Sequence, residues 1–408
     1  MSEVPRVTDG GHGKNLEQGT RPLAALMSAV SSQTAAVIPA FLVGALALEM
    51  GDELRFSEGS LGGAVAFFFL LAAVISPYAG TLSDRLGPQR SLRIANLLSG
   101  AAVLLVATVA YSYWFLLLFL GVGAIGLAIA GPGTKTMVAR GVPLRHHGLA
   151  FGIQAGGVPL AIVLAGLSVP LIGIPAGWRW AFAVAVVVPV VGFLVAPPYQ
   201  AATTIAVRTA GKSRGLSEIE YGPLTMLGIA AALGSAATTT MAAFFVSAAT
   251  DAGIDPATAG YLLAGASGSV VAMRILMGYV ADHREAGHLH IVTALLAIST
   301  LGYLAASTGS KTLLPIGATF ALGAGWAWSG LIVHAVVRVY RDSPGAATSM
   351  ISGGLNVGGV IGPLVFGQIV EHVSYRVGFT MIAVSAFLGA VAVEQGRRRL
   401  EQLLAERM

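Results

Sequence analysis

The sequence predicts an all-α integral membrane protein with twelve transmembrane helices, arranged as two six-helix halves. Three observations predict this fold class. Charged residues make up only 11% of the 408 residues, whereas soluble domains carry about 25%. Long windows without charge recur along the chain, and short motifs of the first half return in the second. A bilayer core about 30 Å thick requires about 20 apolar residues in a helix, which most of these windows supply.

The windows account for twelve spans. Those without Asp, Glu, Lys or Arg are 22–48, 59–83, 94–134, 148–178, 180–207, 221–250, 256–273, 291–310, 312–337, 345–370 and 377–393. The window 94–134 is long enough for two passes, and Tyr111 to Trp114 divide it as an interfacial aromatic turn would. Strands of alternating polarity are missing, so a β-barrel is not expected.

The distribution of positive charge predicts the orientation. With an even number of spans both termini lie on one side, and 18 of the 24 Lys and Arg residues fall there, against four on the other side. The positive-inside rule then places both termini in the cytoplasm of a bacterial inner membrane. The net positive charge of the chain is therefore explained by the membrane topology and does not indicate a nucleic-acid partner. About twenty polar residues precede the first span, so we expect it to be retained and not cleaved as a signal peptide.

An internal repeat divides the chain. Gly80 and Asp84 return as Gly278 and Asp282 after 198 positions, and HGLAFGIQAGG (147–157) aligns with PGAATSMISGG (344–354). The predicted organisation is a cytoplasmic tail (1–21), a six-helix bundle (22–198), a cytoplasmic linker (199–221), a second bundle (222–396) and a C-terminal tail (397–408).

The loop GTLSDRLGPQR (80–90) resembles the signature G-x-x-x-D-R-x-G-R-[RK] of the major facilitator superfamily. The matching residues are Gly80, Asp84, Arg85, Gly87 and the basic Arg90. The second half keeps Gly278 and Asp282, but His283 stands at the Arg position. The resemblance implies two halves that rock around a central site and expose it to each side in turn.

We expect this signature to form a gate and not a substrate site. Gly80 and Gly278 would let helices approach closely, as small residues do in lipid. Asp84 would cap the next helix or pair with Arg85 or Arg90. The alternative is an ordinary solvated turn.

Arg274 is the residue that most needs an explanation. It lies eight residues before Asp282, about 12 Å inside the span, where a charge costs about 2.5–3.5 kcal/mol on insertion scales. None of the twelve spans carries an acid near its midpoint. The hypothesis is that the substrate brings the negative charge, because a guanidinium donates two parallel hydrogen bonds to a carboxylate. The alternative is that Arg274 reaches the cytoplasm or caps carbonyls near the gate.

A second resemblance supports this hypothesis. Arg274 and Gly278 form an R-x-x-x-G similar to that in the eighth span of oxalate/formate exchangers and monocarboxylate transporters, where the resemblance implies that the Arg binds the substrate carboxylate. The first-span acidic–aromatic signature of the monocarboxylate transporters and the eleventh-span lysine of the oxalate exchangers are absent.

Further polar residues within the spans complete a candidate site. The candidate substrate contacts besides Arg274 are Ser32, Gln33, Lys135, Thr238, Thr239 and Asn356. Hydrogen bonding between neighbouring helices is the alternative role for the uncharged ones, and reaching the cytoplasm is the alternative for Lys135. His334, with an ordinary pKa near 6.5, is the candidate proton carrier; its alternative is a hydrogen bond between helices.

These residues predict a secondary transporter of a small organic anion, a carboxylate, by proton symport or anion exchange. A co-moving proton would cancel the potential that opposes anion entry, about 2.3 kcal/mol per charge per 100 mV. The alternative is proton-coupled efflux of drugs or other amphipathic molecules, although the fourth-span Arg and the fifth-span G-P-x-x-G-G typical of such members are absent. Catalytic motifs and cysteines are also absent, so neither an enzyme nor a cofactor is expected. The expected partners are the substrate, protons and the lipid bilayer, with a monomeric protein.

Overall fold

The computed structural model describes residues 22–143, 146–197, 218–283, 287–340 and 344–406. Within these ranges the chain forms helices and no β-strand. Twelve helices are long and apolar enough to cross a membrane. The predicted fold class is therefore confirmed.

The first half contains ten helices. They are α1 (Pro22–Ala45), α2 (Ala47–Leu54), α3 (Glu58–Leu86), α4 (Pro88–Val109), α5 (Tyr113–Gly141), α6 (His147–Ala155), α7 (Gly157–Ser168), α8 (Ile174–Ala176), α9 (Trp178–Ala185) and α10 (Val187–Val195). A π-helical turn at Val169–Gly173 joins α7 to α8, so α6 to α8 form the fifth span, and α9 with α10 form the sixth. The short α2 lies between the first two spans.

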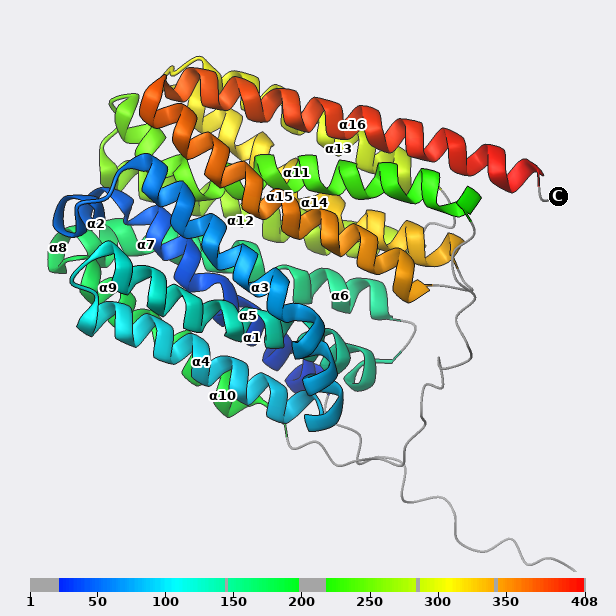
Figure 1. Ribbon diagram of the computed structural model, residues 1–408, viewed down its shortest axis with the longest axis horizontal. Coiled ribbons are helices and arrows are strands. Elements are labelled where there is room, and N and C mark those ends of the chain that lie inside the picture. The colour runs from blue at the N-terminus through cyan, green and yellow to red at the C-terminus, as the bar shows by residue number, and fades with distance from the viewer. Residues whose placement is uncertain (1–21, 144–145, 198–217, 284–286, 341–343, 407–408) are drawn as a thin grey trace, which may run out of the picture.

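The second half contains six longer helices. They are α11 (Glu218–Asp251), α12 (Pro256–His283), α13 (His288–Ser307), α14 (Leu313–Val339), α15 (Pro344–His372) and α16 (Tyr375–Glu406). Figure 1 shows the two halves beside each other, with all long helices along one axis.

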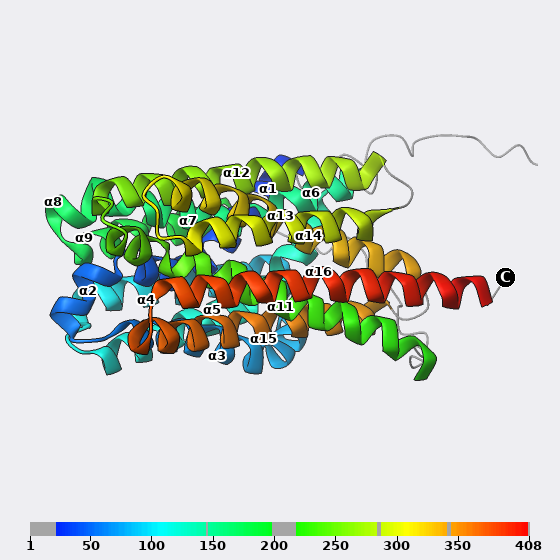
Figure 2. The ribbon, with the colours of Figure 1, turned by 90° about the horizontal axis from the view of Figure 1, so that it is seen from above.

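Two predicted boundaries differ from the structure. Helix α16 continues to Glu406, past the expected end of the bundle at residue 396. The reason is local, because Arg397 pairs with Glu394 and Glu401 on neighbouring turns of the same helix. Figure 2 shows α16 extending past its neighbours. Helix α11 begins at Glu218, inside the predicted linker; the linker residues 199–217 lie outside the described ranges. The division of the window 94–134 is confirmed, since α4 ends at Val109 and α5 begins at Tyr113.

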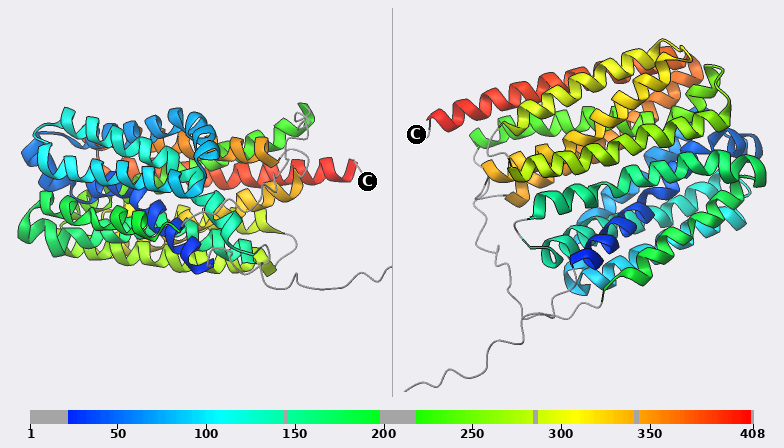
Figure 3. Two further views of the ribbon diagram at one scale, coloured as in Figure 1. Left: turned by 90° about the horizontal axis from the view of Figure 1, so that it is seen from below. Right: turned by 180° about the vertical axis from the view of Figure 1, so that it is seen from behind.

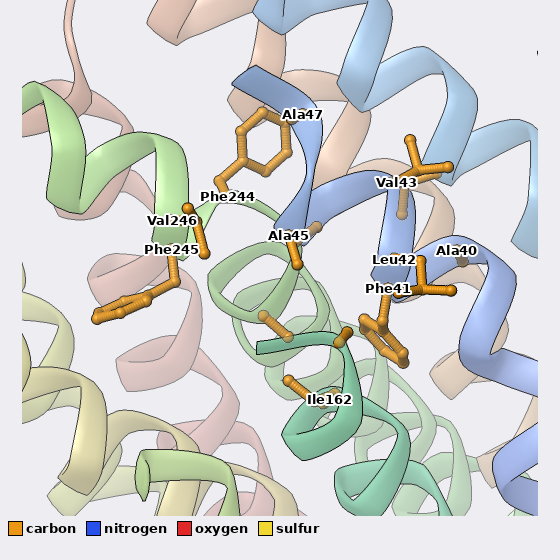
Figure 4. Close-up of a cluster of buried hydrophobic side chains, with 14 of the residues drawn as sticks. Ala40, Phe41, Leu42, Val43, Ala45, Ala47, Ile162, Phe244, Phe245 and Val246 are labelled. Atoms are coloured by element: carbon orange, nitrogen blue, oxygen red, sulfur yellow. The ribbon is translucent and has the colours of Figure 1, made fainter. Parts of the chain in front are cut away.

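The start of α1 and the end of α16 lie at the same end of the bundle, which we call the terminal side; the opposite end is the far side (Figure 1). At the far side the halves meet in a buried apolar cluster formed by α1, α7 and α11. Figure 4 shows Phe41 of α1, Ile162 of α7, and Phe244 and Phe245 of α11 in this cluster. Gly44 permits the contact, because a Cβ there would lie 2.5 Å from the carbonyl oxygen of Ala243.

Helices α3 and α15 meet only towards the far side. A Cβ on Gly62 of α3 would overlap the carbonyl oxygen of Pro363, and one on Gly367 of α15 would lie 2.6 Å from the carbonyl oxygen of Glu58. Farther along, Phe69 packs against Gly359. Beyond that level, towards the terminal side, Gly80 and Gly353 have no neighbouring atom within 4 Å of a Cβ position. The expectation that Gly80 packs closely on another helix is therefore wrong for this conformation.

Helix α12 contacts the first half along most of its length (Figure 3). Towards the far side, a Cβ on Gly166 of α7 would lie 2.8 Å from the carbonyl oxygen of Gly260. Towards the terminal side, a Cβ on Gly278 would lie 2.9 Å from the carbonyl oxygen of Gly148. For Gly278 the predicted close approach of helices is thus observed.

Candidate functional site

A cavity of about 1020 Å³ lies between the two halves. Its lining comes from α1, α3, α5, α6 and α7 of the first half, and from α11, α12, α14 and α15 of the second. On α3 the lining runs from Phe69 to Gly80, and on α15 from Gly359 to Thr348. Both runs lead from the middle of the bundle towards the terminal side, where α3 and α15 have separated. Access to the cavity is therefore from the terminal side.

Arg274 projects from α12 into the wall of this cavity and is only 7% exposed. Its Nη2 donates a hydrogen bond of 3.1 Å to Oγ of Ser329, and its guanidinium carbon lies 5.5 Å from the centre of the Trp326 ring. The Ser329 hydroxyl in turn donates to the carbonyl oxygen of Trp326. Ion pairs formed by the described residues do not include Arg274. The guanidinium is held in place by neutral groups alone.

Two buried donors in this wall lack acceptors. Within the described ranges, neither Nε of Arg274 nor Nε1 of Trp326 has a hydrogen-bond partner. An unsatisfied buried donor costs about 1–3 kcal/mol, and more when it is charged. Both groups belong to cavity-lining residues, but the two atoms themselves are buried, so this cost lies within the wall in the present conformation.

The cavity carries positive charge without a compensating acid. Lys135 of α5 lines it and is exposed to it. Lys135 makes no hydrogen bond or ion pair with any residue that the structure describes. The described lining contains no Asp or Glu. Two cations, one from each half, therefore face a shared space.

A network of neutral polar groups lies beside Lys135. Nε2 of Gln154 donates to Oε1 of Gln33 at 3.1 Å and to Oγ1 of Thr134 at 3.2 Å, and Thr134 donates to Oε1 of Gln33 at 3.4 Å. Gln33 was expected from the sequence, whereas Gln154 and Thr134 were not. The signal for Gln154 was present, since it is an amide in the otherwise apolar run GIQAGG of the fifth span.

The uncharged candidates separate into two groups. Gln33, Thr239 and Asn356 line the cavity, whereas Ser32 and Thr238 do not. Oγ of Ser32 accepts a hydrogen bond of 2.8 Å from Nδ2 of Asn96 on α4. Thr238 donates to the carbonyl oxygen of Gly234 one turn earlier. Successive residues of a helix point about 100° apart, so Ser32 and Thr238 face neighbouring helices, and we do not retain them as substrate contacts.

His334 does not line the cavity either. Its ring centre lies 5.0 Å from that of His288, at the packing contact between α13 and α14. This location corresponds to the interhelical alternative, and we do not retain His334 as a proton carrier for the central site.

The gate residues of the first half are open to solvent. Asp84, Arg85 and Arg90 are exposed, and Asp84 makes no hydrogen bond or ion pair with the described residues. It does not cap α4, whose N-cap residue is Gly87. The expected cap and ion pair are therefore not formed; all three side chains are exposed, and an ion pair between exposed side chains contributes little that would hold them together. Gly87 has φ +77° and makes the turn between α3 and α4. The side chain of Asp282 lies outside the described residues.

A contact at the far side was not anticipated from the sequence. The Oε2 atom of Glu371, at the end of α15, accepts hydrogen bonds of 2.8 Å from Oγ of Ser57 and from the backbone N–H of Gly59. A carboxylate of the second half thus caps the first turn of α3 in the first half. Charge at a helix N-terminus is stabilising by about 0.3–1 kcal/mol, so this cap favours the closed far side.

Twelve spans in two halves, enclosing a central cavity that opens at one side, define an alternating-access membrane transporter. The model of the Major Facilitator Superfamily matches residues 23–339 and 225–399. The chain belongs to this superfamily, as its loop signature indicated.

Known proteins similar to the chain are transporters or resistance proteins. The "Chloramphenicol resistance protein" of Streptomyces lividans is 27% identical over 360 residues, covering 86% of this chain and 90% of that protein. The "Quinolone resistance transporter" of Acinetobacter baumannii is 27% identical over 157 residues, 36% of this chain and 35% of that protein. The "Uncharacterized transporter YycB" of Bacillus subtilis (strain 168) is 25% identical over 372 residues, 88% of this chain and 89% of that protein.

Solved structures share the fold. A bacterial homologue of the human lysosomal transporter Spinster, in an inward-facing and unoccupied conformation, superposes with a TM-score of 0.71 at 18% identity, covering 93% of this chain and 98% of that one. The inward-facing and occupied form gives 0.69 at 17% identity with the same coverage.

Proposed function

We propose that this transporter carries an organic anion, a carboxylate, which binds to Arg274 in the central cavity. The observation that carries the proposal is the charge of the cavity: Arg274 is buried in its wall, and no acid of the described lining neutralises it. A guanidinium held by neutral groups retains donors for an incoming carboxylate. Burying it without any anion would be costly.

The cycle that follows uses the two halves as rocking units. In the conformation described here, α3 and α15 are apart at the terminal side, which we assign to the cytoplasm of a bacterial inner membrane. Substrate would enter from there or leave to there, by proton symport or by exchange for another anion. A membrane potential of 100 mV opposes or favours the movement of one uncompensated charge by about 2.3 kcal/mol. Symport and exchange can be distinguished because a proton gradient changes the rate of symport only.

Efflux of drugs or other amphipathic molecules is the second candidate. The names of two relatives favour it. So does the apolar part of the cavity wall, formed by Phe69, Leu127, Val158 and Trp326. The two candidates differ in the charge of the cargo, since a neutral drug makes no use of an uncompensated guanidinium.

The experiment uses proteoliposomes and a matched pair of cargoes, an aromatic carboxylate and its primary amide. Wild type should carry the carboxylate at least 10-fold faster than the amide, because a hydrogen bond to a charged group contributes about 1.5–3 kcal/mol. Arg274→Gln should lose this preference. Arg376→Gln removes an exposed charge at the far side and serves as the matched control.

Two results would reject the anion assignment. One is equal transport of every anion tried by wild type and Arg274→Gln, with the variant folded normally by size-exclusion chromatography. The other is a wild type that carries the amide and not the carboxylate, which would favour drug efflux. Repeating the assay with and without a pH gradient separates symport from exchange.

A further inference from the structure

Lys135 is a second uncompensated cation in the same cavity, on the opposite half from Arg274. It lies six residues before the end of α5, about 9 Å along the helix, and Arg274 lies nine residues before the end of α12, about 14 Å. The two depths differ by about one helical turn. Because both residues also line the same cavity, a cargo that spans it can meet both cations.

The backbone of α6 separates the two cations into distinct positions. A Cβ on Gly152 would lie 2.9 Å from the carbonyl oxygen of Arg274. Two residues further, Gln154 donates to Oγ1 of Thr134, the neighbour of Lys135 in the chain. Helix α6 thus packs on the backbone of α12 at Arg274 and contacts α5 at Thr134, the residue before Lys135. A cargo that reaches both must present acceptors at two places.

Charge balance then indicates what the cargo carries. In the open conformation the side chain of Lys135 is exposed to the cavity, whereas only 7% of Arg274 is exposed. When the terminal side closes, both are enclosed without any acid of the described lining, and like charges in a medium of low dielectric repel each other. A cargo with a single negative charge neutralises only one of them, whereas a cargo with two neutralises both.

We infer that Lys135 is a second anion-binding position and that the preferred cargo is an organic dianion, with one acidic group at Arg274 and the other at Lys135. This inference rests on the proposed function and specifies its substrate class. Each half of the transporter supplies one of the two cations, so the dianion joins the halves when it binds.

The test compares an aromatic dicarboxylate with its mono-amide on the same ring, as competitors of transport in proteoliposomes. Wild type should prefer the dicarboxylate at least 10-fold. Lys135→Gln should bind the two competitors within about 2-fold of each other, and Lys135→Arg should restore the preference. The control Lys311→Gln removes an exposed lysine outside the cavity and should behave as wild type.

The outcomes separate the two proposals. Equal competition by both compounds in wild type, or a preference that survives in Lys135→Gln, would overturn the assignment of Lys135. The proposed function would still be tested separately, by whether binding of the mono-amide depends on Arg274. If Lys135→Gln fails to fold, Lys135→Ala takes its place and should also lose the preference for the dicarboxylate over the mono-amide. Lys135→Arg should keep this preference, because it retains the positive charge.

Discussion

The two lines of contact between the halves differ along their length. Helix α12 packs on α6 and α7 towards both sides of the membrane, through glycines at both ends of the contact. Helices α3 and α15 pack through glycines towards the far side, but leave Gly80 and Gly353 without neighbours towards the terminal side. The cavity thus opens between α3 and α15 and stays closed between α12 and the helices α6 and α7. Close backbone contact therefore marks where the halves are held together in this conformation.

The largest effect is expected from Gly62→Ala, at the far-side contact of α3 with α15. The added Cβ would overlap the carbonyl oxygen of Pro363, and backbone cannot yield as a side chain does. Overpacking costs about 1–3 kcal/mol, so the far side should be forced apart and transport should fall at least 10-fold. The chain has no cysteine, so spin labels on two introduced cysteines at the far ends of α3 and α15 report the separation.

Gly80→Ala is the matched control on the same helix, since its Cβ would meet nothing within 4 Å. It should keep the wild-type distances and gain slightly in helix stability. Normal transport and unchanged far-side distances in Gly62→Ala would show that this contact does not hold the halves together.

A smaller effect is expected from Gly278→Ala, at the contact of α12 with α6. The Cβ would lie 2.9 Å from the carbonyl oxygen of Gly148, an overlap that a shift of a few tenths of an ångström relieves. Transport should fall about 3- to 10-fold, and spin-label distances between α6 and α12 should increase. Gly268→Ala is the control, because Gly268 of α12 does not line the cavity and has no atom within 4 Å of its Cβ position. An equal loss of transport in both variants would show that the contact of α12 with α6 is not the cause.

Glu371→Gln should shift the balance between conformations without abolishing transport. The amide oxygen can still accept from Ser57 and Gly59, but the negative charge at the start of α3 is lost. This charge contributes about 0.3–1 kcal/mol, so the population with an open far side should rise by up to about 5-fold in spin-label distance distributions. Asp52→Asn, an exposed far-side acid without such a contact, should leave the distributions unchanged; the same shift there would indicate a general charge effect.

The smallest effect is expected from a far-side contact that lies within one half. Arg179 and Trp178 donate to the carboxylate of Glu53, at 2.6 and 2.7 Å, and the hydrogen bond from Arg179 is the main cause that lowers the pKa of Glu53. A lowered pKa stabilises the fold above the ordinary pKa of a Glu, roughly 4.3, and the stabilisation disappears as pH falls through the folded-state pKa.

Arg179→Gln should therefore lower the melting temperature slightly at pH 7, since exposed ion pairs contribute about 0.2–1 kcal/mol. The difference from wild type should begin to shrink as pH falls below roughly 4.3, and it should vanish once pH is below the lowered pKa of Glu53. Spin-label distances between the halves should not change at either pH. A change in those distances would mean that contacts within a half also control the opening.

The fold and the charged part of the candidate site could be predicted because both depend on rare signals. A charge within an apolar span is uncommon and costly, so Arg274 and Lys135 are conspicuous in the sequence, and both line the cavity. Neutral polar residues are tolerated throughout a span. Which way each one faces depends on the rotation of its helix, so Ser32 and Thr238 could not be distinguished from Gln33 and Thr239.

Contacts that depend on the conformation of the transporter could not be predicted from the sequence. Gly80 and Gly278 occupy equivalent positions of the repeat, yet one faces the cavity and the other a neighbouring backbone. The reason is that, towards the terminal side, α3 and α15 are apart while α12 and α6 are in contact. The cap of α3 by Glu371 joins residues 312 and 314 positions apart. Nothing in the local pattern near residue 371 indicates its partner.

Arg274 lies on the contact of α12 with α6, which is closed in this conformation, and this position has a mechanical consequence. Its own carbonyl oxygen faces Gly152 of the other half, so in the rocking cycle proposed above the guanidinium would be carried by a segment close to the pivot. Points near a pivot travel least when two bodies rotate against each other. A cargo bound at Arg274, as we propose, would therefore remain at a nearly fixed location while the movement of α3 and α15 changes the side of the membrane to which it is exposed.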